Sequence, residues 1–546
     1  MGNDAWGNLS IQGDKVCGMA VRNNNPSETN TEKNDPIGNV EHLRRDLAGT
    51  SIRGGMSLTV SVIACNIFRI GGAVVLARLL TPEHVGLVGM VTALTSFAEM
   101  FQDLGLGTAT VQRKDITHDQ VSTLFWINAG LGALIMLLIA GASPLISWFF
   151  GDDRLFSISI AISSCFFFGG LTVQHQALLR RNMHFNRMGI ILVSSTAMSF
   201  AVGIYLAWQG FEYWALVWKD VSRAIFFAIG TWLFYRWLPG LPKRKSGIGT
   251  MLRTGQHVTG FNVLVYFSGN LGQILLGKLW GPGPVGLYKQ AGQLISLPSG
   301  LLNWPLSHIM TPALSALQGE PERYRNYYRK AVSFLAFVYM PLIAYLAVYS
   351  ESIIALVLGE KWMAASTVLR ILALGAFVDP IASTCGAVMI TCGKTKDYFR
   401  WGVISAICLT AAFSIGALWG LIGVVTAYVA YNYLTLLPLL WFSFKDTPIA
   451  ISLFREAITL PALSSVIMSL LLVIVGYAVK PSTALAEIAL STLLGPALYL
   501  GVWVLLPSGK QRLIEHFFYL RRAFDALPFS AWSRASRVLW TGRGAM

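Results

Sequence analysis

Long apolar stretches, each close to the thickness of a membrane, alternate with short polar segments along most of this chain. A helix that crosses a bilayer needs about 20 mostly apolar residues. The pattern predicts fourteen such helices and therefore an all-α polytopic membrane protein. The predicted spans lie near residues 56–80, 84–108, 120–142, 156–178, 188–208, 212–235, 255–280, 284–312, 330–349, 364–391, 399–418, 420–443, 457–479 and 484–506.

The overall composition supports a membrane protein and argues against a soluble enzyme. Of the 546 residues, 54% are hydrophobic and only 13% are charged, whereas an average soluble domain has about 25% charged residues. The chain also has 17 Trp and 18 Tyr, and both residue types are enriched where helices meet the membrane surface.

The net charge of +15 raises nucleic acid as a partner. The basic residues, however, occur in short clusters between apolar runs, so we expect no nucleic-acid binding. The six cysteines are scattered without a Cys-x-x-Cys pair or a Cys–His metal spacing. We therefore expect no disulfide framework, no metal site and no cofactor.

The distribution of Lys and Arg among the short loops predicts the orientation in the membrane. Loops on the side of the N-terminus carry nineteen of these residues, and the opposite loops carry three. Because cytoplasmic loops are enriched in Lys and Arg, both termini are predicted to be cytoplasmic. The expected location is the bacterial inner membrane, with short loops on the outer side.

An eleven-residue segment occurs twice, as ARLLTPEHVGL at 77–87 and GKLWGPGPVGL at 277–287. Five positions are identical at a constant offset of 200, and Arg78 aligns with Lys278. Chance similarity between turn-forming residues is one explanation. The position of both copies after the first helix of a six-helix block favours two related lobes, which are common in transporters that work by alternating access.

These features divide the chain into six parts. Residues 1–50 are polar, rich in Asn and without an apolar signal segment, so we expect a disordered cytoplasmic extension. The predicted parts that follow are an N-lobe (51–238), a basic cytoplasmic linker (239–250), a C-lobe (251–443), two further spans (444–506) and a basic cytoplasmic tail (507–546).

The 6+6+2 arrangement resembles the multidrug/oligosaccharidyl-lipid/polysaccharide exporter superfamily. Within it, the chain is similar to the polysaccharide flippases of lipopolysaccharide and exopolysaccharide biosynthesis (the Wzx-like branch). The resemblance covers about residues 40–510. The segments that carry it are LARLLTPEHVGLVGMV (76–91), FQDLGLGTATVQRKD (101–115), ALLRRNMHF (177–185), GKLWGPGPVGLYKQAGQLISLPSGLLNWP (277–305) and TPALSALQGEPERYR (311–325).

The resemblance implies a substrate class: an oligosaccharide repeat unit on undecaprenyl pyrophosphate, flipped from the cytoplasmic to the periplasmic leaflet. Membrane lipids, and a polysaccharide polymerase or export machinery, would be partners. A drug/cation antiporter of the same superfamily is the first alternative, although intramembrane cations here outnumber anions. A membrane glycosyltransferase or polysaccharide polymerase is the second, but no sizeable outer loop is predicted.

Charged residues inside predicted spans are candidate functional residues, because a charge at mid-bilayer costs about 2.5–3.5 kcal/mol on insertion scales. A pyrophosphate in a low-dielectric cavity needs cationic partners. The candidates are Arg69, Lys219, Arg223 and Lys289. We expect Asp220 to reach Arg223 three residues further on, which would leave Lys219 the less neutralised cation.

The acidic candidates for ion coupling or charge pairing are Glu99, Asp103 and Asp379. Arg69 and Glu99 are predicted at similar depth, so an ion pair that only holds two helices together is an alternative to a binding role. Asp379 precedes Pro380 in the middle of a predicted span, and this proline would free a backbone carbonyl.

Two polar stripes in the predicted C-lobe are candidates for binding sugar hydroxyls. Their members are Asn262, Tyr266, Asn270 and Gln273 on one span, and Gln293 and Asn303 on the next. Hydrogen bonds between helices are the simpler explanation. Arg78 and Lys278, near outer helix ends, are expected to extend toward the membrane surface.

Overall fold

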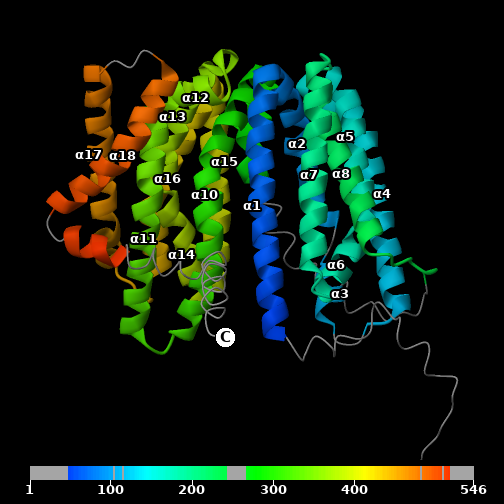
Figure 1. The fold of residues 1–546 in the computed structure, drawn as a ribbon, viewed down its shortest axis with the longest axis horizontal. Helices are drawn as coiled ribbons and strands as arrows, with labels where there is room; N and C mark the ends of the chain where they lie inside the picture. The colour runs from blue at the N-terminus through cyan, green and yellow to red at the C-terminus, as the bar shows by residue number, and fades with distance from the viewer. Residues whose placement is uncertain are drawn as a thin grey trace, which may run out of the picture.

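The computed structural model describes residues 47–102, 105–113, 116–242, 266–479, 483–506 and 509–516, and the regular elements assigned within these ranges are helices. The predicted extension at 1–46, most of the basic linker and the tail beyond residue 516 lie outside the described residues. In Figure 1 the helices run roughly parallel, with the end of α1 at the top. We call this the upper end of the molecule.

The first part of the described chain, which we call the N-lobe, contains eight helices, and several of them pack on helices distant in sequence. Thr117 begins α4 with a capping box, in which its side chain accepts from the Gln120 backbone N–H and Gln120 accepts in return. Gly151 ends the same helix with φ of 75°, a conformation that favours glycine. The helices are α1 (Leu47–Leu79), α2 (Pro82–Gln102), α3 (Leu106–Gln112), α4 (His118–Phe150), α5 (Arg154–Gly170), α6 (Val173–Arg181), α7 (Phe185–Trp208) and α8 (Trp214–Phe234).

The C-lobe begins, in the described residues, with a helix over residues 266–280. Its other elements are α10 (Pro282–Ala316), α11 (Pro321–Val348), α12 (Ser350–Val357), α13 (Ala364–Ala376), α14 (Asp379–Thr391), α15 (Thr395–Gly416) and α16 (Gly420–Phe444). Two last long helices, α17 (Ile451–Val479) and α18 (Ala484–Leu505), pack beside α11 and α12 at the far side of this lobe (Figure 1).

The prediction of a polytopic helical membrane protein is confirmed. Nine segments of the described chain are long and apolar enough to cross a membrane, and one of them, Thr395–Phe444, contains two of the predicted spans. The number fourteen itself stays a prediction. Helix α8 is not among the nine because Lys219, Asp220 and Arg223 interrupt its apolar sequence.

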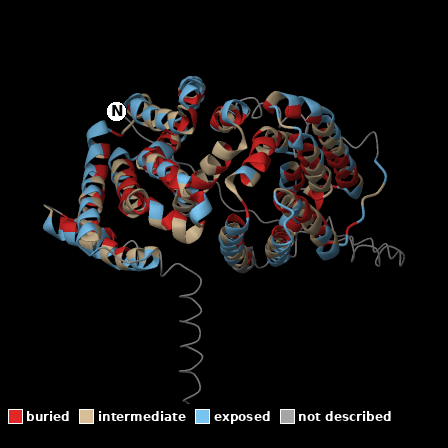
Figure 2. Ribbon diagram, turned by 90° about the horizontal axis from the view of Figure 1, so that it is seen from above, coloured by how far each residue is buried: buried red, intermediate tan, exposed pale blue. Residues whose placement is uncertain are grey.

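The exterior of the helices is apolar, as expected of a surface in contact with lipid. Leu138 on α4, Leu434 on α16 and Leu493 on α18 are 62%, 75% and 77% exposed. Contiguous exposed leucines would make a soluble protein aggregate. Figure 2 shows buried residues concentrated where helices face one another and exposed residues on the outer faces.

Three predicted spans are interrupted by short breaks that hydropathy does not reveal. The second is divided into α2 and α3, and Gly105, directly before α3, has a φ of 75°. The fourth is divided into α5 and α6 around Leu171, and the tenth into α13 and α14 around Phe377. Broken helices inside a membrane occur where the freed backbone faces protein or a water-filled space.

Candidate substrate-binding site

Charged side chains from three helices come together between the two lobes. The Nζ of Lys219 lies 2.9 Å from a carboxylate oxygen of Asp220 on α8. Arg223 and Asp220 are the charged groups that act on Glu99 of α2, and Lys289 of α10 lies in the field of Asp220 and Lys219. We call these residues (Glu99, Lys219, Asp220, Arg223 and Lys289) the charged cluster.

The expected pairing within α8 is wrong. Asp220 forms its ion pair with the preceding Lys219, whereas Arg223 is exposed and faces toward Glu99. The flexible four-carbon stem of lysine lets its ammonium reach a neighbouring carboxylate even though the two residues point in different directions on the helix. Arg223, and not Lys219, is therefore the cation of α8 that is more open to solvent.

Arg69 on α1 is exposed, and its guanidinium donates to Asn66 at 3.5 Å. The alternative of an Arg69–Glu99 ion pair receives no support, because the charges that act on Glu99 come from α8. Gly72, one turn along α1, lies against the Phe200 ring, and this ring is 5.7 Å from Nζ of Lys219. Through Gly72 and Phe200, α1 thus reaches the part of the N-lobe that holds Lys219.

Three C-lobe residues predicted to bind substrate form hydrogen bonds with α2 of the N-lobe. The Tyr266 hydroxyl donates to the Ala93 carbonyl at 3.0 Å, and the Gln273 amide donates to the Gly89 carbonyl at 2.9 Å. The Lys289 ammonium donates to the Thr92 hydroxyl at 3.1 Å. These bonds agree with the simpler explanation of the stripes, interhelical hydrogen bonding, and they place the stripes at the boundary between the lobes.

The remaining predicted residues divide into two groups. The Asn270 amide donates to the Tyr266 carbonyl at 3.0 Å within its own helix, and Gln293 on α10 is half-buried. Asp103 and Asn262, and the side chain of Asn303, lie outside the described residues.

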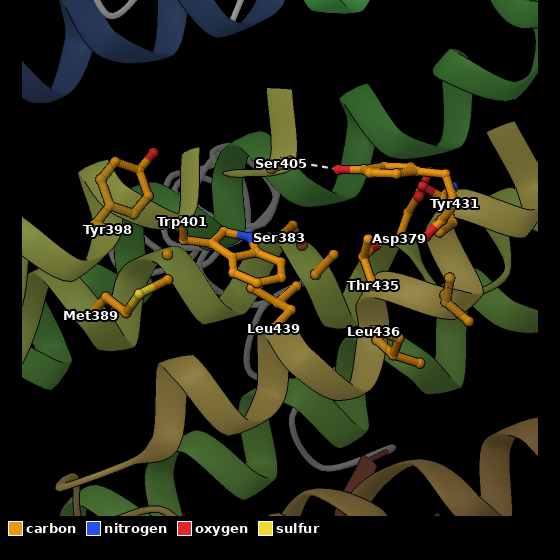
Figure 3. Close-up of a pocket in the computed structure, with 14 residues that line it drawn as sticks. Asp379, Ser383, Met389, Tyr398, Trp401, Ser405, Tyr431, Thr435, Leu436 and Leu439 are labelled. Atoms are coloured by element: carbon orange, nitrogen blue, oxygen red, sulfur yellow. Dashed lines mark hydrogen bonds between the residues drawn. The ribbon is translucent and has the colours of Figure 1, made fainter. Parts of the chain in front are cut away.

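A cavity of about 290 Å³ lies within the C-lobe between α14, α15 and α16. Figure 3 shows Asp379, Tyr431 and Thr435 at one end, and Tyr398 and Met389 at the other, with the Trp401 indole between them. Asp379 is the first residue after the break between α13 and α14. The carboxylate of Asp379 acts electrostatically on two neighbouring residues, Tyr339 and Tyr428.

Sequence reasoning identified Asp379 but missed the rest of this cavity. Tyr431, Asn432 and Thr435 form a polar patch in the apolar helix α16, and their spacing of one and three residues puts them on neighbouring faces. Tyr431 and Ser405 of α15 share a hydrogen bond. This patch was the signal that could have located the cavity.

The chemistry of the two sites differs. The charged cluster contains three cations and two carboxylates, and Glu99 and Arg223 are exposed although they lie within helices of membrane length. Charges within a membrane favour contact with water or protein over contact with lipid. This cluster suits an anionic group, whereas the cavity around Asp379 suits a hydroxylated or cationic one.

Comparison with known proteins gives the family. Residues 75–367, more than half of the chain, match the family model described as polysaccharide biosynthesis protein. The chain belongs to this polysaccharide biosynthesis protein family. The resemblance inferred from the sequence is thereby confirmed.

Relatives in the family carry names from surface polysaccharide synthesis. The chain is 27% identical over 474 residues to the teichuronic acid biosynthesis protein TuaB of Bacillus subtilis (strain 168), covering 85% of this chain and 97% of TuaB. It is 26% identical over 364 residues to the lipopolysaccharide biosynthesis protein WzxC of Escherichia coli (strain K12), covering 65% of this chain and 73% of WzxC.

Two solved structures share the fold of this family member at low sequence identity. One is the lipid II flippase MurJ in an inward closed conformation, with 16% identity, a TM-score of 0.67, and coverage of 82% of this chain and 97% of MurJ. The other is an inward-facing multidrug resistance MATE transporter of the MOP superfamily, with 14% identity, a TM-score of 0.55, and coverage of 74% and 99%.

Proposed function

We propose that this protein is a flippase that moves a lipid-linked oligosaccharide from the cytoplasmic to the periplasmic leaflet of the bacterial inner membrane. The carrier is an undecaprenyl pyrophosphate, and the product feeds the synthesis of a surface polysaccharide. Transport proceeds by alternating access of the N-lobe and the C-lobe. The protein forms and breaks no covalent bond of the substrate, so it is not an enzyme.

The charged cluster is the observation that carries this proposal. A pyrophosphate brings negative charge into the membrane, and Lys219, Arg223 and Lys289 offer cations from both lobes to receive it. Arg69 adds a fourth cation from α1. Arginine matches phosphate oxygens with a planar fork, and lysine supplies a mobile point charge.

The remaining parts of the substrate are assigned by chemistry. Polar groups at the lobe boundary (Asn262, Tyr266, Asn270, Gln273, Gln293 and Asn303) would face the sugars when the lobes separate. The apolar surfaces of α17 and α18 would accommodate the polyprenyl chain. The family membership and the names of the relatives support this substrate class without specifying the sugars.

We further propose that ion coupling, where it occurs, uses a carboxylate among Glu99, Asp103 and Asp379. The loop charges place both termini in the cytoplasm in this proposal. Membrane lipids and a polysaccharide polymerase or export machinery would be the partners.

The test is the sidedness of lipid-linked oligosaccharide in cells that lack this protein. We expect accumulation in the cytoplasmic leaflet, relieved by the wild type but not by a Lys219→Gln/Arg223→Gln variant. Arg370→Gln is the matched control, because Arg370 pairs with Glu351 at 2.8 Å on an exposed surface away from the charged cluster. Absence of accumulation in the deletion strain would contradict the flippase proposal.

A drug/cation antiporter is the second candidate, and one observation favours it. Asp379 lies in a cavity whose lining includes Tyr431 at the same end and Trp401 further along, and aromatic rings near a carboxylate attract organic cations. An antiporter would make cells lacking the protein sensitive to cationic compounds while leaving the oligosaccharide distribution unchanged. Asp379→Asn would then abolish resistance, whereas the Lys219/Arg223 variant would retain it.

A further inference from the structure

The repeated segments of the two lobes touch each other at the upper end. A Cβ on Gly86 of α2 would lie 1.7 Å from the carbonyl oxygen of Pro282, which begins α10. A Cβ on Gly286 of α10 would lie 1.8 Å from the carbonyl oxygen of Pro82, which begins α2. The contact is thus reciprocal, and glycine is needed at both positions because two helix backbones meet there.

A second reciprocal contact involves the cations that precede these helices. Arg78, in the last turn of α1, donates to the carbonyl of Leu356 near the end of α12. Its repeat counterpart Lys278 donates to the carbonyl of Phe149 near the end of α4. The last carbonyls of a helix have no partner within the helix, and a cation near them is favourable. Each lobe therefore caps a helix of the other lobe.

A glycine with positive φ follows each acceptor helix. Gly151 directly follows α4 with a φ of 75°, whereas Gly359 lies two residues after the last residue of α12 and has a φ of 93°. Residues around these glycines also correspond, since Gly151-Asp152 and Gly359-Glu360 each carry an acidic residue after the glycine. The donors and the acceptors of the contact thus both follow the internal repeat.

One contact breaks the symmetry. The buried Trp362 donates its indole N–H to the carbonyl of Ala77 at 2.7 Å. The residue three positions after Gly151 in the N-lobe is Arg154, which instead pairs with Glu83 and Asp152 within its own lobe. At the upper end, the C-lobe therefore donates one hydrogen bond to the N-lobe that Arg154 does not return.

We propose that these residues form a gate, the reciprocal clasp (Arg78, Pro82, Gly86, Lys278, Pro282 and Gly286), which closes the upper end and opens as one unit. The clasp has two halves, the contact of Gly86 with Pro282 and the contact of Gly286 with Pro82, and a two-fold relation connects them. A rotation of one lobe against the other therefore separates both contacts at once. The donors and acceptors that open are cations and carbonyls close to the membrane surface, where water can replace their hydrogen bonds. The role as a gate rests on the proposed transport function, although its opening can be measured without any substrate.

Opening of the reciprocal clasp is tested with a buried reporter cysteine. Val285 on α10 is 0% exposed, and its side chain lies 3.1 Å from where a Cβ on Gly89 would be. Val285→Cys is introduced into the full chain with the six native cysteines replaced by serine. An impermeant maleimide is then added outside intact cells, and the labelling rate is measured.

We expect Gly86→Ala and Gly286→Ala each to raise the labelling rate about tenfold, which corresponds to about 1.4 kcal/mol lost from the closed state. The double variant should label no more than about twice as fast as either single variant, because breaking one half already opens the unit. Gly283→Ala is the matched control on α10, since its Cβ would meet nothing within 4 Å, and it should label at the parental rate.

Arg78→Gln and Lys278→Gln keep the proposal testable if the alanine variants fail to fold, because they insert no atom into the contact. Each should raise the labelling rate about three- to fivefold. Folded variants whose labelling equals that of the parent would overturn the clasp as a gate and leave a permanent interface. Failure of the flippase proposal has a separate signature, since deletion of the protein would then leave the oligosaccharide distribution unchanged, whatever the labelling of the variants.

Discussion

Thr92 and Lys289 face each other across the lobe boundary, with 3.1 Å between the threonine hydroxyl and the lysine ammonium. A hydroxyl accepts a hydrogen bond but does not neutralise the charge. The ammonium form of Lys289 is thereby positioned to act on an anion near the charged cluster. Because its anchor belongs to the other lobe, its position also depends on how the lobes are arranged.

Removal of this charge should impair transport. We expect Lys289→Met to lower the rate of oligosaccharide translocation at least tenfold, because a charge-assisted hydrogen bond contributes about 1.5–3 kcal/mol. Lys289→Arg should retain more than half of the activity, and Thr92→Ser, which keeps the hydroxyl, should match the wild type. Equal rates for Lys289→Met and the wild type would exclude a role in binding.

Asp220 should compete with an anionic ligand for Lys219. The carboxylate lies 2.9 Å from Nζ of Lys219, so Asp220→Asn frees the ammonium and adds one unit of positive charge to the charged cluster. We expect the affinity for inorganic pyrophosphate to rise about fivefold, which is the scale of a partly exposed ion pair. Titration calorimetry on the purified protein measures it.

The opposite change provides the control for that prediction. Lys219→Gln removes the cation and leaves the carboxylate of Asp220, so pyrophosphate should bind more weakly than to the wild type. A tighter complex with Lys219→Gln, or a weaker one with Asp220→Asn, would show that Asp220 is not the competing anion.

Gly132 of α4 lies against Gly170 of α5, and this contact should tolerate no added side chain. A Cβ on Gly132 would lie 2.5 Å from the Phe166 carbonyl oxygen, so Gly132→Ala should lower the free energy of unfolding by about 1–3 kcal/mol. Gly130, two residues earlier on α4, has nothing within 4 Å of such a Cβ. Gly130→Ala should leave the thermal midpoint unchanged or slightly raised, and equal losses for both would contradict the packing argument.

Stability should fall between pH 6.5 and pH 4 because of His516. Burial lowers the pKa of His516 from 6.5 to about 4, and the nearby Arg512 acts in the same direction. Its ring stacks on Phe337 with centroids 4.8 Å apart, and its Nε2 lies 3.3 Å from the Ser333 hydroxyl. The unfolded chain therefore takes up a proton at a pH at which the native protein does not.

The direction in which stability changes with pH follows from this difference in proton binding. The contribution of His516 to the free energy of unfolding is fully present above pH 6.5. It falls as the pH decreases and levels off below about pH 4, with a total loss of about 3 kcal/mol. Thermal unfolding in detergent at several pH values measures this. His516→Gln has no imidazole to titrate, so its stability should change less over this range. An identical pH profile for the wild type and His516→Gln would disprove the assignment.

Hydropathy and loop charge predicted the class of fold because the membrane imposes its thickness on each helix. The break before Asp379 was not predicted, since a turn of two residues changes neither the apolar content nor the length of the segment. The charges of α8 were recognised as candidates from sequence, but their partners were not. Whether Asp220 meets Lys219 or Arg223 depends on side-chain conformation and on neighbouring helices.

Contacts between distant segments were the least accessible to sequence reasoning. The repeat predicted that Pro82–Gly86 and Pro282–Gly286 occupy corresponding turns, but an offset of 200 residues contains no information that the two copies touch. Tyr266 and Gln273 were identified as polar positions on one helix face. That this face meets the backbone of α2 depends on how the lobes pack against each other.

The contact of Gly86 with Pro282 and of Gly286 with Pro82 has the form of an isologous dimer interface, in which residue i meets j and j meets i. Such an interface arises naturally between two identical subunits and is preserved here within one polypeptide. The two copies of the repeated segment therefore meet as two subunits of a symmetric dimer would, although one chain supplies both of them. Arg78 and Lys278 differ in side chain between the two copies, whereas each glycine is constrained by a backbone encoded about two hundred residues away.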